Sequence, residues 1–134
     1  MLEKPFQVGS LAAWYWSSEK KSKARVLLIH GLHEHCHRHL NTITQLHALG
    51  LEVISFDLRG MGQSGGMRQW VNHFLEYVED TASVFQWIQR ELPPKPLFML
   101  GHSLGGGNCD LFCLSLSSCS FRSCPIFSWL FDWG

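Results

Sequence analysis

The residues most suited to covalent chemistry lie in the stretch Gly101-His102-Ser103-Leu104-Gly105-Gly106, which is a G-x-S-x-G motif. The motif follows residues 96–100, an uncharged apolar run that is typical of a buried strand in a parallel sheet. A strand, this motif and a following helix form the context of a nucleophile elbow, whose strained turn lifts the serine above the sheet edge. Side chains at 101 and 105 would clash with the neighbouring strand or helix, which favours glycine at both. The motif predicts Ser103 as a nucleophile for carbonyl chemistry, and the alternative is a glycine-rich turn with an incidental serine.

A second group of reactive side chains is the set of five histidines and one cysteine within residues 30–39. Imidazole and thiolate are ligands for zinc, nickel or copper, so one interpretation is a metal or other binding site that uses His33, His35 and His37. The competing interpretation is an oxyanion loop, because a His-Gly pair follows an apolar strand and a helix comes next. Since such a backbone turns sharply and its side chains point several ways, we expect no native metal ion. Metal binding by this cluster remains the alternative function.

Glycines also recur in residues 58–66, directly after another apolar strand. Gly60 and Gly62 resemble part of a dinucleotide-binding fingerprint, but Arg59 stands in front of them and a strand–helix pair already precedes the loop. We therefore expect no cofactor. The spacing favours a tight loop, in which Asp57 and Arg59 hold the backbone through side-chain hydrogen bonds and the glycines supply positive φ.

The strands that must position these groups follow from apolar runs bounded by polar or glycine-rich residues. These runs predict four strands, at residues 11–16, 25–29, 51–57 and 96–100. The first of these strands is expected to enter the sheet antiparallel to its neighbour.

Helical spacing of apolar residues predicts two helices between these strands. The first runs from Leu40 to Leu49, packs a leucine face on the sheet and is closed by Gly50. The second runs from about Trp70 to Glu91 and is ended by two prolines. The resulting order predicts an α/β sheet with its active edge at the carboxyl ends of the strands.

The composition excludes several classes of protein. A chain of 134 residues allows one domain with a sizeable core. Lys plus Arg and Asp plus Glu number 11 each, so no net field attracts nucleic acid or an anionic membrane. The first residues lead into no apolar segment of a signal peptide, and an odd, uneven set of five cysteines favours reduced thiols in the cytoplasm.

Three motifs occur in order between residues 25 and 107. They are His30-Gly31-Leu32 with Glu34-His35, then Phe56-Asp57-Leu58-Arg59-Gly60-x-Gly62-x-Ser64-x-Gly66-x-Arg68, then the serine motif. In this order and spacing they resemble the α/β-hydrolase superfamily, and within it the monoacylglycerol lipase and lysophospholipase group, also called the serine aminopeptidase-like hydrolases. Three positions depart from that group's usual residues: His33 replaces glycine, Met61 replaces histidine and His39 replaces tyrosine.

The resemblance implies a serine hydrolase that acts on a small lipid-like ester. It implies Ser103 as the nucleophile and the backbone N–H groups of Leu32 and Leu104 as the oxyanion hole. In this superfamily the triad acid and then a histidine follow the serine, but only Asp110 and Asp132, and no histidine, follow it here. We therefore expect an incomplete α/β-hydrolase sheet, mostly parallel with helices on both faces and without its C-terminal strands, and an inactive chain. The family's strand order would place residues 25–29 between residues 95–100 and 51–57.

Residues 108–134 contain four of the five cysteines and many serines, and they keep neither helical nor strand periodicity. One interpretation is a truncated or frame-shifted reading frame, so that residues 1–107 are the N-terminal half of a hydrolase domain and residues 108–134 an atypical tail. A second is a membrane-associated C-terminus at residues 111–133, but Arg122 and Pro125 interrupt it, so we expect no membrane span. A third is a four-cysteine zinc site, although no C-x₂-C pair occurs. Apolar surface left by missing strands predicts non-specific self-association.

Overall fold

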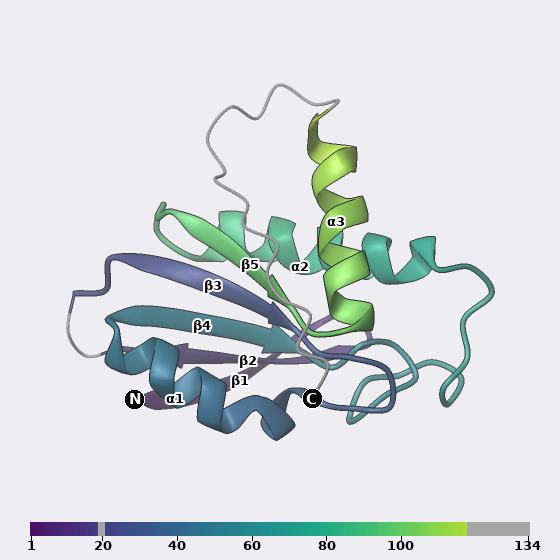
Figure 1. The fold of residues 1–134 in the computed structure, drawn as a ribbon, viewed down its shortest axis with the longest axis horizontal. Coiled ribbons are helices and arrows are strands. Elements are labelled where there is room, and N and C mark those ends of the chain that lie inside the picture. Colours follow the sequence, from purple (N-terminus) through teal and green to yellow (C-terminus); the bar gives the residue numbers. More distant parts are fainter. Residues whose placement is uncertain (19–20, 118–134) are drawn as a thin grey trace.

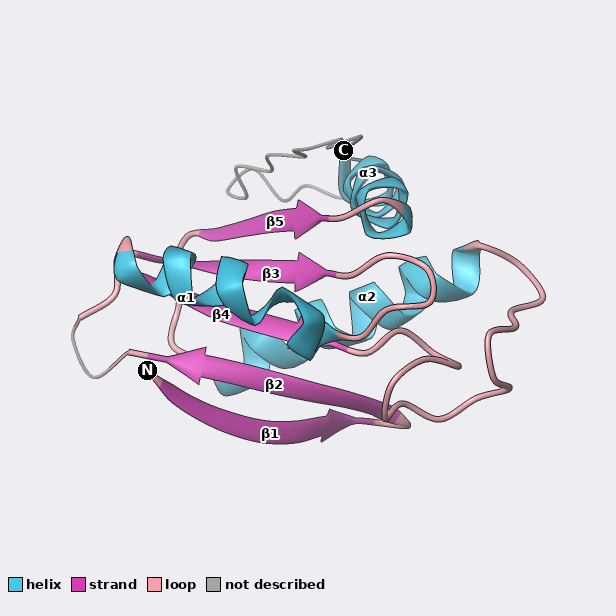
Figure 2. Cartoon of the chain, turned by 60° about the horizontal axis from the view of Figure 1, so that its bottom comes forward, coloured by secondary structure: helices cyan, strands magenta, loops and turns pink. Residues whose placement is uncertain are grey.

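The computed structural model of the protein describes residues 1–18 and 21–117 (Figure 1). The described residues form a five-stranded sheet in the order β1-β2-β4-β3-β5 with helices on both faces, which confirms the predicted α/β class (Figure 2). The strand β2 runs antiparallel to both of its neighbours, and the other pairings are parallel. In chain order the elements are β1 (Leu2–Val8), β2 (Leu11–Ser17), β3 (Ala24–Ile29), the 3₁₀ helix η1 (Cys36–His39), α1 (Leu40–Ala48), β4 (Leu51–Phe56), α2 (Leu75–Glu91), β5 (Leu97–Gly101) and α3 (Leu104–Ser117).

The strand β3 is the centre of the parallel part of the sheet. Its residue Val26 pairs with Val53 of β4 on one side and with Phe98 of β5 on the other. This register confirms the predicted strand order. Every residue of β3 is buried, as expected of a strand covered on both faces.

The edge strand β1 is an element that the sequence pattern does not predict. It pairs with β2 along its whole length, from Leu2 opposite Ser17 to Val8 opposite Leu11. Most of its side chains are exposed, and they include Lys4 and Pro5. A charge and a proline suit an edge strand, since they discourage pairing with another chain, but they also remove the apolar alternation by which a strand is recognised.

The sheet divides the core into two layers (Figure 2). On one face Leu27 and Ile29 of β3 pack with side chains of α2 and α3. On the other face Leu28 packs with Ile43 of α1 and with Cys36. Alternate residues of β3 therefore face opposite layers, and both layers must be covered by helices.

The helix α1 agrees with its predicted bounds but packs differently. It is followed by Gly50 at φ 82°, the left-handed conformation expected of a closing glycine. Its fully buried side chain is Ile43, whereas Leu40 and Leu49 are exposed. The expected leucine face is therefore confirmed only in part: Ile43 supplies the fully buried contact, and Leu46 packs partly buried against the same cluster.

The helix α2 begins at Leu75, five residues later than the predicted start at Trp70. Trp70 is exposed, and the preceding segment turns rather than continuing the helix. The carboxylate of Glu76 accepts the N–H groups of Asn72 and His73, so the chain is held in a turn just before the helix. The predicted stop is confirmed, because Leu92 before the two prolines is already extended.

The helix α3 crosses the expected boundary between residues 107 and 108, and its Cys109 and Phe112 belong to the core. Residues 118–134, on which most of the tail interpretations depend, lie outside the described residues. Within the part that the structure describes, no helix is both long and apolar enough to cross a membrane.

Candidate active site

The serine motif forms a sharp turn between β5 and α3. Ser103 lies between the last residue of β5 and the first of α3, and its φ of 53° is in the left-handed region. For a residue other than glycine this conformation costs of order 1–3 kcal/mol and persists only where the surroundings impose it. Its side chain is exposed, so the turn holds the hydroxyl at the carboxyl edge of the sheet.

The two glycines of the motif explain how the turn is imposed. A Cβ atom on Gly101 would overlap the backbone of Gly105 and Gly106, and a Cβ on Gly105 would overlap the carbonyl groups of Ile29 and His30. The N–H of His102 donates to the carbonyl of Ile29 at 2.9 Å, which extends the β3–β5 ladder into the turn. The elbow is therefore fixed by backbone contacts on both sides, as the motif predicts.

The other two predicted site residues flank this turn. Leu104 is the first residue of α3, where a helix leaves N–H groups without an intrahelical partner. Leu32 lies in the loop after β3 and its side chain is exposed. Because Ile29 pairs with Gly101, the sheet brings the loop that carries Leu32 to the same edge as Ser103.

His30 organises this loop from inside the core. Its side chain is fully buried, with Nδ1 2.7 Å from the carbonyl oxygen of Gly31 and Nε2 2.9 Å from the N–H of Leu58. The N–H of Leu58 must donate to Nε2, so Nδ1 carries the proton and donates to Gly31. Burial lowers the pKa of His30, which favours this neutral form. Both ring nitrogens are engaged, so His30 positions the backbone of two loops.

Asp57, at the carboxyl end of β4, joins two loops. Its Oδ1 accepts from the N–H and the thiol of Cys36 at 2.8 and 2.9 Å, and its Oδ2 accepts from the N–H of Gln63 at 2.8 Å. Burial, together with the hydrogen bond to Asp57, raises the pKa of the Cys36 thiol well above its usual range. Cys36 is therefore an inert structural thiol.

The glycine-rich loop is tight, as predicted, with φ of 74°, 49° and 96° at Gly60, Gly62 and Gly66. The prediction for Asp57 holds within the loop, but Arg59 reaches out of it. The Arg59 guanidinium pairs with both carboxylate oxygens of Asp80 at 2.6 Å and with Glu76 at 2.7 Å. Arg59 therefore anchors the loop to α2.

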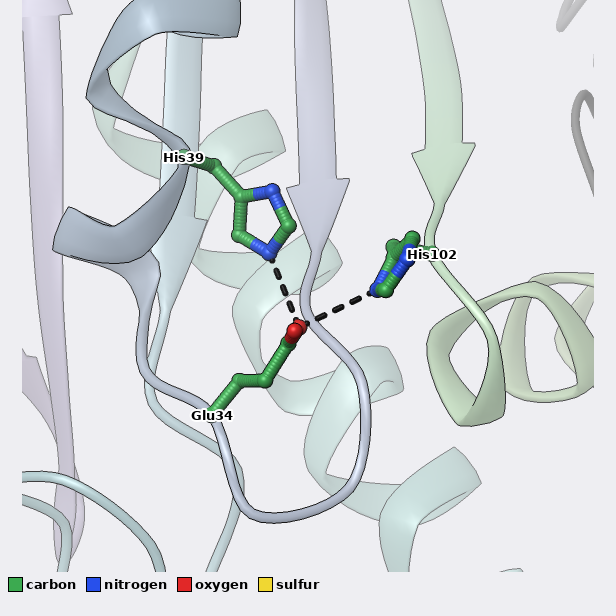
Figure 3. A group of neighbouring side chains, drawn as sticks. All are labelled: Glu34, His39 and His102. Atoms are coloured by element: carbon green, nitrogen blue, oxygen red, sulfur yellow. Dashed lines mark hydrogen bonds and ion pairs between the residues drawn. The ribbon is translucent and has the colours of Figure 1, made fainter. Parts of the chain in front are cut away.

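Sequence reasoning missed a cluster formed by Glu34, His39 and His102 (Figure 3). The Oε2 atom of Glu34 lies 3.0 Å from Nε2 of His39 and 3.1 Å from Nδ1 of His102, and it accepts the N–H of Gly31 at 2.9 Å. Burial alone would raise the pKa of Glu34, but these hydrogen bonds and the nearby histidine charges outweigh it and lower the pKa to about 2. Glu34 is therefore ionised throughout the neutral range.

The histidines considered as metal ligands do not gather at one point. His33 and His35 are exposed, and His37 packs edge-on against Trp14 and pairs with Glu3 at 2.9 Å. Among residues 1–18 and 21–117, the group close enough to share a metal ion is Glu34, His39 and His102.

Two cavities lie at opposite ends of the sheet. One of about 210 Å³ adjoins the candidate site and is lined by residues that include Glu34, Met61 and Arg68. A larger one of about 260 Å³ lies at the amino end of β5, among residues that include Leu97 and Leu116. The smaller cavity shares Glu34 with the cluster that includes His102, the residue before Ser103, but Ser103 itself does not line it.

Comparisons with known proteins agree with this geometry. Residues 20–118 match the family described as serine aminopeptidase, S33. The chain is 38% identical to the monoglyceride lipase of Mus musculus over 92 residues, which are 69% of this chain and 30% of that protein. It is 32% identical to a phospholipase of Bacillus subtilis over 94 residues, which are 69% of this chain and 35% of that protein.

Comparison with a solved structure agrees with these sequence matches. The monoacylglycerol lipase of Paleococcus ferrophilus matches with a TM-score of 0.68 and 27% identity over 80% of this chain and 38% of that one. The chain spans about a third of the length of the curated relatives described above. The family match over most of its length, together with the shared fold, shows that this chain belongs to the serine aminopeptidase (S33) family of α/β hydrolases.

Proposed function

We propose that this chain is the N-terminal part of a serine hydrolase that cleaves lipid-like carboxylic esters, with Ser103 as the nucleophile. The observation that carries the proposal is the left-handed φ of Ser103, 53°, imposed by two glycines that have no room for a Cβ atom. The printed names of the relatives, a monoglyceride lipase and a phospholipase, support a lipid-like ester as the substrate class.

In the proposed reaction the Oγ atom of Ser103 attacks the ester carbonyl carbon and the alcohol leaves from an acyl-enzyme, which water then hydrolyses. The developing oxyanion accepts hydrogen bonds from the backbone N–H groups of Leu32 and Leu104. These two donors come from loops that follow the adjacent strands β3 and β5, which supports their convergence at one edge.

The base is the part of the machinery that we propose this chain lacks. No histidine follows Ser103 in the sequence, whereas the superfamily places its catalytic histidine there. Of the earlier histidines, His30 uses both ring nitrogens within the core, and His39 and His102 face Glu34. The chain alone should therefore turn over esters only slowly, with an oxyanion contribution of roughly 10³–10⁴ over the reaction in water.

Two measurements test this function. Hydrolysis of p-nitrophenyl butyrate by the purified chain should be near background and little changed by Ser103→Ala. Rapid turnover abolished by that substitution would contradict the missing base. A chimera that joins residues 1–117 to the C-terminal remainder of the mouse monoglyceride lipase should hydrolyse a monoacylglycerol and lose this activity on Ser103→Ala. A folded chimera without activity would contradict the assignment of the nucleophile.

The alternative, a non-catalytic or metal-binding product built on His33, His35 and His37, has less support. His37 is engaged with Glu3 and Trp14, and the other two side chains are exposed. Zinc titration of a variant with these three histidines replaced tests it directly: loss of micromolar binding would favour the alternative.

A cytoplasmic location is a further proposal. It is supported by the free, buried thiols of Cys36 and Cys109, since reduced cysteines are typical of the cytoplasm. Self-association of the isolated chain also stays a prediction. The exposed side chains of Leu111 and Leu114 on α3 support it, and static light scattering would detect it.

A further inference from the structure

The cluster of Glu34, His39 and His102 brings together three metal-binding atoms from two separate parts of the chain (Figure 3). Glu34 and His39 belong to the loop and 3₁₀ helix that follow β3, and His102 belongs to the elbow that follows β5. The carboxylate oxygen lies between the two rings, 3.0 Å from one ring nitrogen and 3.1 Å from the other. The three atoms all lie within 4.8 Å of one another.

These separations suit a tetrahedral metal ion. With bonds of about 2.0–2.2 Å to imidazole nitrogen and carboxylate oxygen, neighbouring ligand atoms of a zinc ion lie roughly 3.3 Å apart. The two nitrogen–oxygen distances are already close to that value, so binding needs the two rings to move together while the carboxylate stays in place. Two histidines and one glutamate are also a set that zinc uses when it keeps a fourth position open.

The surroundings hold the ligands while leaving access from solvent. Glu34 and His39 have side chains that are 12% and 15% exposed, whereas His102 is 46% exposed and offers a route of entry. The N–H of Gly31 fixes the carboxylate from behind, as outer hydrogen bonds do in metal sites. The positive charge of Arg38 would repel a bound metal ion, because its side chain lies 3.4 Å from Glu34. That side chain is 67% exposed, however, and can turn into water.

We propose that Glu34, His39 and His102 form a binding site for a first-row transition-metal ion, of which zinc fits best, next to Ser103. Binding replaces the N–H donated by each imidazole to Glu34 with a lone pair donated to the metal, and the proton of each neutral ring moves through solvent to its other ring nitrogen. The ion would join the loop after β3 to the elbow after β5. It would therefore stiffen the backbone that carries Ser103 and leave one coordination position open beside it.

Calorimetric titration of the purified full chain with zinc chloride tests the site. Thiols that react with N-ethylmaleimide are alkylated first, so that reactive cysteines contribute nothing to the binding. We expect one ion per chain, and we expect His39→Gln or His102→Gln to weaken binding at least roughly tenfold. Glutamine keeps an N–H that can donate to Glu34, so the fold is disturbed little. The matched control is His35→Gln, an exposed histidine of the same loop, which should bind as the wild type does.

Two further readouts separate a lost ligand from a lost fold. Zinc should raise the melting temperature of the wild type and of His35→Gln but not that of His39→Gln. The cobalt form of the wild type should show the visible absorption of a tetrahedral nitrogen and oxygen site without thiolate charge transfer. A folded wild type that binds no zinc would overturn the proposal. Binding unaffected by His39→Gln and His102→Gln, or lost in His35→Gln, would overturn it as well.

Discussion

Gly105 at the start of α3 lies directly against the carbonyl group of Ile29 at the end of β3, with no space for a Cβ atom between them. The helix that follows Ser103 is thus pressed onto β3, the central strand of the parallel part of the sheet. Because this contact joins backbone to backbone, it fixes the height and direction of the elbow more firmly than side-chain packing could. The position of Ser103 relative to the loop after β3 depends on it.

The first prediction compares neighbouring glycines of α3. Gly105→Ala places a methyl group into the backbone of β3, so we expect a loss of about 1–3 kcal/mol in the free energy of unfolding. At Gly106 the nearest atom to an added Cβ is 3.7 Å away, an ordinary contact, and alanine favours a helix. Gly106→Ala should therefore stabilise by about 0.5–1 kcal/mol. Urea unfolding of both variants checks this, and equal effects would contradict the close approach at Gly105.

The second prediction concerns backbone strain at Ser103. Ser103 has a φ of 53°, which glycine adopts without penalty and alanine does not. Ser103→Gly should therefore be more stable than Ser103→Ala by about 1 kcal/mol. Both variants lack the hydroxyl, so the difference isolates the backbone. Thermal unfolding measured side by side would show it, and an alanine variant as stable as the glycine variant would indicate an unstrained turn.

Much of the fold could be predicted because its signals are local. Uncharged apolar runs mark β3, β4 and β5, and the glycine and proline positions mark where helices end. The strand β1 could not be found this way. Lys4 and Pro5 suit its position at the edge of the sheet, but they interrupt the apolar alternation by which a strand is recognised. The predicted start of α2 at Trp70 is too early, because Trp70 is exposed and the chain turns before Leu75. Exposure of a large apolar side chain is decided by tertiary packing, which the sequence alone does not contain.

The candidate site was predictable only in part. Ser103 follows from its motif, because strand, glycines and helix all lie within a short stretch. The Glu34–His102 contact spans 68 positions and exists because β5 pairs with β3 in one register. The run of histidines offered a metal site only as the alternative interpretation, and it did not indicate that His39, rather than His33 or His35, lies with Glu34 and His102. The roles of Ser103, Leu32 and Leu104 and the boundary at residue 107 stay predictions.

The third prediction concerns Asp57, whose two oxygens serve separate loops. In Asp57→Asn one oxygen becomes an NH₂ group that cannot accept the N–H of Cys36 or Gln63. A buried donor is then left without a partner, which should cost about 1–3 kcal/mol. Asp110→Asn on the exposed side of α3 is the matched control and should change stability little. Hydrogen exchange at the Cys36 and Gln63 amides would report the loss; unchanged protection would contradict the role of Asp57.

The fourth prediction concerns the buried carboxylate of Glu52 at the opposite end of the sheet. Its Oε2 accepts from Arg25 at 2.9 Å and its Oε1 accepts from Lys95 at 2.9 Å. Burial by itself would raise the pKa of Glu52, but the hydrogen bonds from Lys95, Ser22 and Tyr15 outweigh it and lower the pKa below its ordinary value of 4.5.

A carboxyl group whose pKa is lower in the folded than in the unfolded chain stabilises the fold fully above the unfolded pKa. That contribution is lost as the pH falls from about 4.5 through the folded value. At neutral pH, Glu52→Gln should cost about 3 kcal/mol, because it leaves the buried Arg25 without its anion. The cost should shrink as the pH falls below 4.5 through the folded pKa, where the wild-type carboxylate takes up a proton. Urea unfolding across this range would show the two curves converging, while Glu79→Gln, an exposed change on α2, should follow the wild type throughout. A difference between wild type and Glu52→Gln that stays constant with pH would mean that the Glu52 charge does not stabilise the fold.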